Sequence, residues 1–277
     1  MVRLLMLPET VASYEHLCKS SAMNIALLIN RDLASHIALG RLIGLLGEHR
    51  LSIFISEKVG RDHSLPQPLM ALAEFEKQLV ATSSQSFDSL ASQANCQLQG
   101  FADIGSKVNS PEAVARIQAA APDVILSIRF GLILREPVIA IPRHGVINLH
   151  SGVLPYYGGV MASFRAMING EAQIGSTLHF IQDAGVDTGD ILSIAKIPLN
   201  PQQSYLLNVL NLYDAGCQQL ARAVQQLDQG ADLQAQPQQG DAGYYSFPSE
   251  QQLAEFAALG YQLFDSAEIE QIRALQG

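Results

Sequence analysis

Three side chains between Gly145 and Leu192 are of types that can act together on a reacting carbonyl group: Asn148, His150 and Asp187. Val146 to Leu149 is a mostly apolar run with two β-branched residues, which predicts a short buried strand. Because side chains two apart on a strand share a face, the amide and the imidazole should emerge together where the strand ends. Asp187 lies in Gly-Val-Asp-Thr-Gly-Asp, a glycine-flanked sequence that predicts a loop between two further strands.

This set of residues suits a reaction that passes through a tetrahedral, negatively charged intermediate. Asn148 and a protonated His150 can both donate hydrogen bonds to the developing oxyanion. Asp187 would favour the charged imidazole and help to carry a proton. No serine or cysteine stands in an obvious nucleophile position, so we expect the attacking group to belong to a substrate. A lone histidine at a strand end is more often structural, but the Asn-x-His pair, the glycine-rich loop and the later aspartate together favour catalysis.

The elements that must position these residues begin with a β-α-β unit. Asn24 to Ile29 is almost wholly apolar, as in a strand buried on both faces of a parallel sheet. A helix from Leu33 to Leu46 and a strand from Leu51 to Ile55 follow, which predicts a Rossmann-like sheet. The first turn has no glycine-rich phosphate cradle, which disfavours a dinucleotide. Its polar residues are candidates for binding an acceptor, or are simply solvated: Asn30, Arg31 and Asp32.

Further along the chain, a helix-rich stretch from Glu57 to Leu98 is followed by a helix that Ser110 and Pro111 open. Asp123 to Ile128 is the next buried strand, and Phe130 to Leu134 leaves its carboxyl end, where ligands bind in open α/β sheets. We expect a helix over 164–169, strands over 176–181 and 191–197, and one long amphipathic helix over 202–229. His179, within one of these strands, is interpreted as a packed or supporting residue rather than a catalyst.

The carboxy-terminal part begins with a Gln- and Gly-rich linker or extended arm over 231–243. The aromatic segment Tyr244 to Pro248 is expected to staple the tail to the core rather than to close over a ligand. Ser249 and Gln252 have the spacing of a capping box at the start of a last helix.

Composition and charge exclude several classes of protein. The chain has 277 residues, 48% hydrophobic and 16% charged, with 17 Lys and Arg against 26 Asp and Glu. The basic residues are not clustered, which argues against nucleic acid as a partner. Three distant cysteines indicate neither a disulfide framework nor a zinc site, and we expect no metal. No apolar run approaches membrane-spanning length and Met1 to Leu7 is too short for a signal peptide, so we expect a cytoplasmic protein.

The motifs in the middle of the chain resemble those of the folate-dependent formyltransferases, which act on glycinamide ribonucleotide, methionyl-tRNA or amino sugars. The family signature is Asn-x-His, a loop ending Leu-Leu-Pro and a later Leu-Asp-x-Gly. Here these are Asn148-Leu149-His150, Val153-Leu154-Pro155 and Val186-Asp187-Thr188-Gly189. Phe130 to Leu134 resembles the segment that lines the folate pocket in the methionyl-tRNA enzymes. The resemblance covers roughly residues 23 to 200.

The resemblance implies a Rossmann-like α/β catalytic core over 23–200, with an amino-terminal extension over 1–22 and a short helical extension over 201–277. It implies Asn148, His150 and Asp187 as the catalytic residues. It also implies a pocket for 10-formyltetrahydrofolate formed by Phe130, Gly131, Leu132, Ile133, Leu134, Asp183, Ala184, Gly185 and Val186. Two departures lie in the loop after the histidine. Ser151 and Gly152 replace Pro-Ser or Gly-Ser, and Gly158 replaces an arginine.

We therefore expect an N-formyltransferase that uses 10-formyltetrahydrofolate as donor. An amino sugar on a nucleotide carrier and a hydroxylated amino acid, such as a siderophore precursor, are the favoured acceptors. Methionyl-tRNA is disfavoured, because that group of enzymes adds a basic β domain whereas residues 201–277 are acidic. A 10-formyltetrahydrofolate hydrolase and a non-catalytic folate-binding protein are the alternatives, and whether the chain forms a homodimer is left open.

Overall fold

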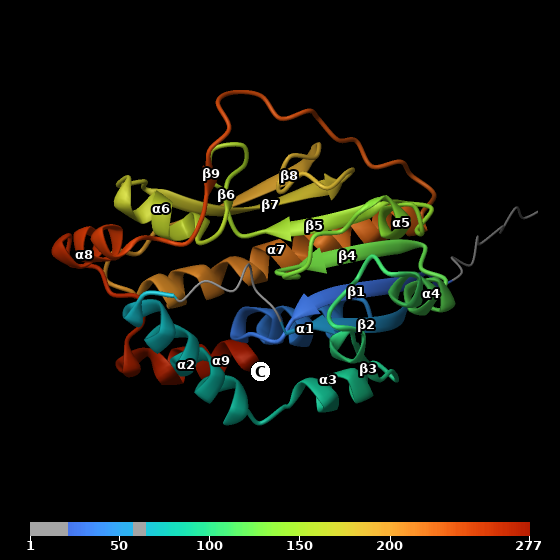
Figure 1. Cartoon of the computed structure of the whole chain (residues 1–277), viewed down its shortest axis with the longest axis horizontal. Coiled ribbons are helices and arrows are strands. Elements are labelled where there is room, and N and C mark those ends of the chain that lie inside the picture. The colour runs from blue at the N-terminus through green and yellow to red at the C-terminus, as the bar shows by residue number, and fades with distance from the viewer. Residues whose placement is uncertain (1–21, 58–64) are drawn as a thin grey trace, which may run out of the picture.

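The structure is a computed structural model that describes residues 22–57 and 65–277, and its centre is a seven-stranded sheet in the order β3-β2-β1-β4-β5-β7-β8 (Figure 1). The strands are β1 (Asn24–Asn30), β2 (Arg50–Ser56), β3 (Leu98–Gly100), β4 (Val124–Ile128), β5 (Val146–His150), β6 (Gly158–Gly159), β7 (Gln173–Ile181), β8 (Ile191–Pro198) and β9 (Tyr244–Tyr245). The helices are α1 (Leu33–Leu45), α2 (Gln67–Ala81), α3 (Phe87–Gln93), α4 (Pro111–Ala119), α5 (Glu136–Ile139), α6 (Ala162–Ile168), α7 (Tyr205–Asp228), α8 (Glu250–Ala258) and α9 (Ile269–Gln276).

One half of the sheet is parallel, as the sequence predicts for an α/β fold. β1 pairs in parallel with β2 and β4, β2 with β3, and β4 with β5. Every residue of β1 except its first is buried, because helices cover both faces of a parallel sheet. Two predicted helix starts are confirmed by their caps. The Asp32 side chain accepts from Ser35 N at the start of α1, and Ser110 accepts from Ala113 N at the start of α4.

The two faces of the sheet carry separate cores, and this separation decides on which face the candidate residues lie. On one face, Ile147 and Leu149 of β5 belong to the large core formed with α1 and α7. On the other face, Val146 packs with residues of α4 and α5. Since side chains alternate along a strand, Asn148 and His150 lie on the same face as Val146, away from α1 and α7.

The other side of the sheet is antiparallel, whereas the sequence pattern predicts two strands there without their direction. β7 pairs antiparallel with β5, from Val146 opposite Ile181 to His150 opposite Thr177. β8 then pairs antiparallel with β7. The connection between β7 and β8 therefore begins beside the amino-terminal end of β5, whereas His150 lies at the carboxyl end of that strand.

α7 crosses the sheet directly behind the candidate residues. Ser204 caps this 24-residue helix by accepting from Leu207 N. Gly216 lets the helix lie close to β5: a Cβ built on it would be 3.0 Å from both Cδ atoms of Leu149. The residue after it, Cys217, is fully buried in the same core. Residues 201–277 thus share the core of the sheet.

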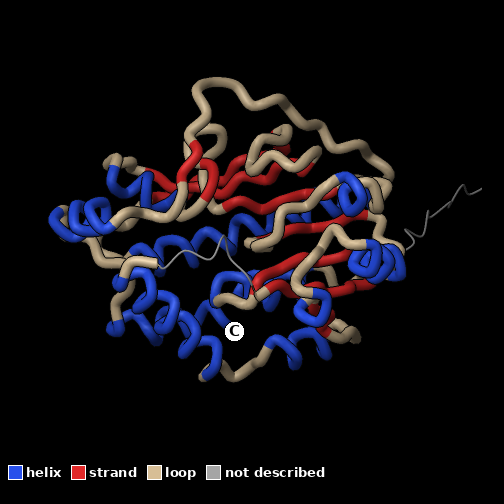
Figure 2. Tube along the Cα trace, viewed as in Figure 1, coloured by secondary structure: helices blue, strands red, loops and turns tan. Residues whose placement is uncertain are grey.

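After α7 the chain forms a long segment without helix that runs to β9 (Figure 2). β9 pairs in parallel with β6, and the Tyr245 ring stacks on Tyr157 at 6.2 Å between centroids. The aromatic segment therefore attaches the tail to the core, as predicted. The predicted capping box between Ser249 and Gln252 is also present at the start of α8. Residues 1–21, most of the predicted amino-terminal extension, lie outside the described residues. Over 22–57 and 65–277, no helix has the length and apolarity needed to cross a membrane.

The contact between Gly216 and Leu149 leads to a stability prediction. Gly216→Val should lower the free energy of unfolding by about 1–3 kcal/mol, because the added methyl groups overlap a packed core side chain. The matched control is Gly44→Val in α1, where a Cβ would meet no described atom within 4 Å. It should stay within about 0.5 kcal/mol of wild type, since valine and glycine differ little in helix propensity. Urea unfolding measures both, and equal stabilities for the two variants would contradict the packing described.

Candidate active site

β5 places Asn148 and His150 side by side at its carboxyl end, as the spacing predicts. The His150 side chain is buried, whereas Asn148 is half-buried and reaches the surface of the sheet. Both lie between the parallel neighbour β4 and the antiparallel neighbour β7. The amide and the imidazole can therefore face one ligand from one strand.

Asp187 reaches the same point from the loop between β7 and β8. Its Oδ2 lies 3.5 Å from Nδ1 of His150 and accepts a hydrogen bond of 2.7 Å from Gly159 N. The backbone of Asp187 is left-handed, with φ 57°. The glycine after it is required by space, because a Cβ on Gly189 would lie 1.9 Å from the Phe180 carbonyl oxygen. The loop thus folds back from the far edge of the sheet until its carboxylate meets His150.

The two ring nitrogens of His150 have different surroundings. Nε2 is 2.7 Å from the carbonyl oxygen of Tyr157 and donates to it. Nδ1 faces Asp187 at 3.5 Å, which is longer than a normal hydrogen bond. A donor role toward a ligand therefore falls to Nδ1. Gly152 explains how the loop comes so close, since a Cβ there would lie 2.4 Å from the Tyr157 oxygen and 2.6 Å from Nε2. The departure from the family at this position thus bears directly on the imidazole.

His179 belongs to the same polar cluster, which is consistent with a packed or supporting residue. It is buried, as the packed role requires, but its Nε2 is 3.0 Å from Nδ2 of Asn148 and 3.5 Å from Oδ1 of Asp187. Its Nδ1 lies 2.9 Å from the Phe180 carbonyl oxygen. His179 stands directly opposite Asn148 in the antiparallel register. His179 is a neighbour of Asn148 because β7 runs antiparallel to β5, and the sequence pattern does not give the direction of that strand.

The electrostatics of the cluster centre on the carboxylate of Asp187. Burial alone would raise its pKa, but the charge of His150, the neighbouring imidazole of His179 and the hydrogen bond from Gly159 N outweigh burial and lower the pKa to about 2. The site thus keeps Asp187 as a carboxylate between two imidazoles, where it is available to accept a proton.

The predicted folate-binding segments lie at two different strand ends. Phe130 and Leu132 are half-buried against the core under α4 and α5, and Leu134 is fully part of that core. Ile133 is 55% exposed and is thus available to a ligand. The second segment, 183–186, follows β7, which runs antiparallel to β5. The two loops therefore leave the sheet at opposite ends of its strands. Only the return of the loop toward His150 brings that segment near the catalytic candidates. Gly131 donates from its backbone to Ser56 Oγ.

The polar turn after β1 is mostly occupied by structural contacts. Asn30 is buried and accepts from Ser56 Oγ at 3.0 Å. Asp32 caps α1 and forms an ion pair of 2.8 Å with Arg129. Arg31 is exposed, in an ion pair with Glu57 at 3.1 Å. Of the three predicted acceptor-binding residues, only Arg31 therefore has a side chain exposed enough to meet a ligand.

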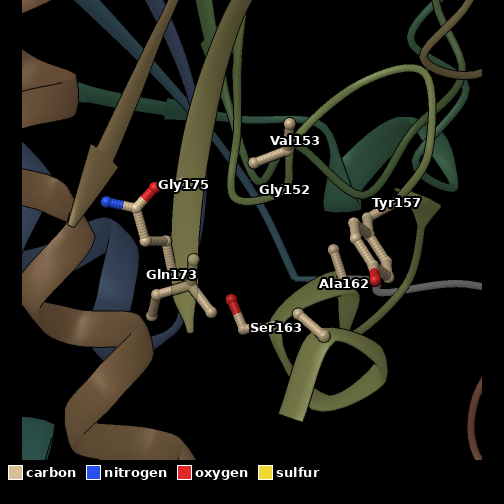
Figure 3. A pocket seen from close by; sticks show the side chains of 9 residues that line it. Gly152, Val153, Tyr157, Ala162, Ser163, Gln173 and Gly175 are labelled. Atoms are coloured by element: carbon tan, nitrogen blue, oxygen red, sulfur yellow. The ribbon is translucent and has the colours of Figure 1, made fainter. Parts of the chain in front are cut away.

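Two hollows lie outside the catalytic cluster. One of about 10 Å³ lies between the loop after β5, α6 and the start of β7, with Tyr157 and Ser163 in its wall (Figure 3). It has room for roughly one water molecule. The other, of about 720 Å³, is lined by α2, α8 and residues 261–264. Neither lining includes Asn148, His150 or Asp187. Within the described residues, no cluster of three or more His, Cys, Asp or Glu is arranged to hold a metal ion.

Comparison with known proteins identifies the family. The sequence profile described as "Formyl transferase" matches residues 76–215, just over half of the chain. The chain therefore belongs to the formyl transferase family. It is 43% identical over 97 residues to methionyl-tRNA formyltransferase of Geobacter sulfurreducens, covering 35% of this chain and 30% of that protein. It is 34% identical over 125 residues to that of Chlamydia pneumoniae, covering 45% and 39%. The chain thus spans less than half of the length of either relative.

Solved structures show the same fold at low sequence identity. An N-formyltransferase from Helicobacter canadensis, solved with folinic acid and dTDP-3-aminofucose, has a TM-score of 0.55 at 18% identity, over 83% of this chain and 72% of that one. Glycinamide ribonucleotide transformylase 1 from Symbiobacterium toebii has a TM-score of 0.55 at 18% identity, over 78% and 94%. The predicted Rossmann-like formyltransferase fold is confirmed.

The lowered pKa of Asp187 predicts how stability depends on pH. An unfolded aspartate titrates near 3.8 and the folded one near about 2. Its contribution is therefore complete above about pH 4 and lost as the pH falls through about 2. The stability advantage of wild type over Asp187→Asn should shrink by about 2 kcal/mol across this window. Denaturant unfolding at several pH values measures it. Asp241→Asn, at an exposed carboxylate, is the control and should track wild type, and an advantage that stayed constant with pH would contradict the assignment.

Proposed function

We propose that this protein is an N-formyltransferase that moves a formyl group from 10-formyltetrahydrofolate to an amine of a small molecule. The observation that carries the proposal is the meeting of Asn148, His150 and Asp187 at one point in a chain of the formyl transferase family. The Helicobacter canadensis relative in fold was solved with a folate and an amino sugar, which supports the same class of donor and acceptor.

The geometry supports a mechanism in which the neutral amine of the acceptor attacks the formyl carbon. A C–N bond forms and the carbonyl oxygen takes the negative charge. In this mechanism the Asn148 amide and the Nδ1–H of His150 donate hydrogen bonds to that charge, and such donors act most strongly when they are already in place. Asp187 places a negative charge 3.5 Å from the Nδ1 atom of His150. Asp187 accepts the proton that the amine loses. As the carbonyl re-forms, the bond from the formyl carbon to the folate nitrogen breaks, and that proton passes to the folate nitrogen.

The donor would lie against the exposed side chain of Ile133 and the half-buried Phe130 and Leu132. An apolar surface with backbone groups at its edge suits a flat heterocycle. Asp183 to Val186 would form the opposite wall, since this segment precedes Asp187 in the loop that returns to His150.

The charge of the chain favours a small acceptor over tRNA. Binding tRNA means neutralising several phosphates with basic residues, whereas this chain carries a net charge of −9. After Pro198 the basic residues are Arg222 and Arg273. A small acceptor needs one or two charges, and the exposed Arg31 lies where β1 ends. An amino sugar on a nucleotide carrier or a hydroxylated amino acid fits these requirements.

The proposal is tested by supplying 10-formyltetrahydrofolate with a library of small amines, with methionyl-tRNA at low salt, or with no amine. We expect a mass gain of one formyl group on a small amine. Efficient formylation of the tRNA would replace the small acceptor by tRNA. Rapid formate release without amine would instead support a hydrolase, and tight donor binding without any turnover would support a folate-binding protein.

The role of His150 predicts a large loss of activity. His150→Ala should lower kcat by about a hundredfold to a thousandfold, as the loss of an oxyanion donor does, while donor affinity stays within a few-fold. His49→Ala, at a half-buried histidine outside the site, is the matched control. Steady-state kinetics and donor titration measure the two effects, and near-normal turnover in His150→Ala would rule out the mechanism.

The donor pocket is tested at Ile133. Ile133→Asp should weaken donor binding at least tenfold, because it puts a charge against the apolar face of the heterocycle. The control is Leu259→Asp, at a leucine of similar exposure (58% against 55%) beyond the end of α8. Calorimetric titration with a folate measures both affinities. Equal affinities in the two folded variants would place the pocket elsewhere.

A further inference from the structure

The segment between α7 and α8 touches both loops that hold the catalytic candidates. We define the strap as residues 236–245. Figure 1 shows this orange segment passing along the edge of the sheet beyond β8 before it reaches β9 beside β6. At its first residue, Gln236 and Ile191 exchange backbone hydrogen bonds of 2.8 and 2.9 Å. At its other end, β9 pairs with β6.

Gln238 is the strap residue that binds the loop of Asp187. Its half-buried side chain donates from Nε2 to the carbonyl oxygen of Asp187 at 2.7 Å and to that of Gly189 at 2.9 Å. One amide nitrogen carries two hydrogens, so both are used on this loop. The loop backbone is left-handed at Asp187, with φ 57°, a conformation that needs surrounding contacts to persist.

The far end of the strap binds the loop after β5. Gly158 N donates to the Gly243 carbonyl at 2.8 Å, and Val160 N donates to the Tyr245 carbonyl at 2.8 Å. Between these two residues, Gly159 N donates to Asp187 Oδ2. The two backbones approach so closely that only glycine fits at position 159, because a Cβ there would be 2.2 Å from the Tyr245 oxygen. The strap therefore fixes the donor that holds the carboxylate as well as the backbone that carries it.

We propose that Gln238 is a positioning residue for formyl transfer: by holding the carbonyl groups of Asp187 and Gly189 it keeps the Asp187 carboxylate against His150. The inference rests on the proposed function for its kinetic part, whereas the positioning of the loop can be measured without any substrate. A purely structural role would make Gln238 matter for stability alone. A positioning role makes it matter for the loop and for kcat, since a displacement of about 1 Å can cost a hundredfold in rate.

The main test variant is Gln238→Met, which keeps the length of the side chain and removes both donors. Its matched control is Gln239→Met, at the next residue of the strap, whose exposed side chain has no hydrogen bond to any part of the chain that the structure describes. Hydrogen exchange of the amides over 183–190 is measured in the full-length proteins without ligand. Gln238→Met should exchange faster there than wild type and Gln239→Met, because the loop opens more often.

In the formyl-transfer assay, Gln238→Met should lower kcat by about 10- to 100-fold with the KM for the amine within about threefold. A second variant, Gln238→Glu, adds a readout that packing would not move. Its carboxylate cannot donate, but its protonated form can, and the two carbonyl oxygens that it would face disfavour the charged form. Its kcat relative to wild type should therefore rise as the pH is lowered from about 8 to about 5, toward the ordinary pKa of a glutamate, about 4.3.

The two arms separate the two hypotheses. If exchange over 183–190 is the same in wild type and Gln238→Met, the positioning role is wrong, whatever the assay shows. If exchange increases but kcat is unchanged in an active enzyme, the role is wrong for catalysis. If wild type formylates no amine, the proposed function fails, and faster exchange in Gln238→Met still supports the contact between the strap and the loop.

Discussion

The Asp187 carboxylate is the point on which the site depends, because it joins parts of the chain that are far apart in sequence. One oxygen faces the Nδ1 of His150 and accepts from Gly159 N, and the other faces His179. Burying a carboxylate without partners is costly, so these contacts must form together or the loop cannot close. The lowered pKa of Asp187 expresses this balance. Each of the two histidines has the Asp187 carboxylate as a neighbour, and these contacts hold the loop where it folds back across the sheet.

The antiparallel edge makes this return possible. A parallel strand after β5 would have carried the next loop to the same edge as His150 by way of a crossover. Here β7 runs the other way, so its residues stand opposite those of β5 and His179 comes to lie beside Asn148. The parallel half of the sheet supplies the strand ends at which ligands bind in such folds. The antiparallel part supplies the carboxylate of Asp187, from the loop between β7 and β8. The site forms where the two halves meet.

The sequence predicts those features of the site that depend on residues close together along the chain, and not those that depend on how distant segments pack. Two residues apart on a strand, Asn148 and His150 share a face, and the glycines around Asp187 predict a loop. These local patterns therefore predict the members of the cluster but not its geometry. The position of His179 depends on strand direction, which no local pattern states. The carbonyl of Tyr157 that accepts from His150 is a backbone atom and has no sequence signature. Polar turn residues such as Asn30 and Asp32 are candidates in the sequence for binding a ligand or for simple solvation. In the structure Ser56 and Arg129, which are distant along the chain, bind them instead.

The pairing of β6 with β9 also bears on the order in which the molecule can be made. During synthesis the strand with Asn148 and His150 leaves the ribosome well before Gly243, Tyr244 and Tyr245 exist. The sheet and α7 can collapse on their shared core in that interval, because nearly all of that core precedes the strap. The loop after β5 has to wait for its backbone partners, and such long-range contacts form slowly. A nascent chain with a complete sheet would therefore hold an incomplete reaction centre, and activity would mark the end of folding rather than its beginning.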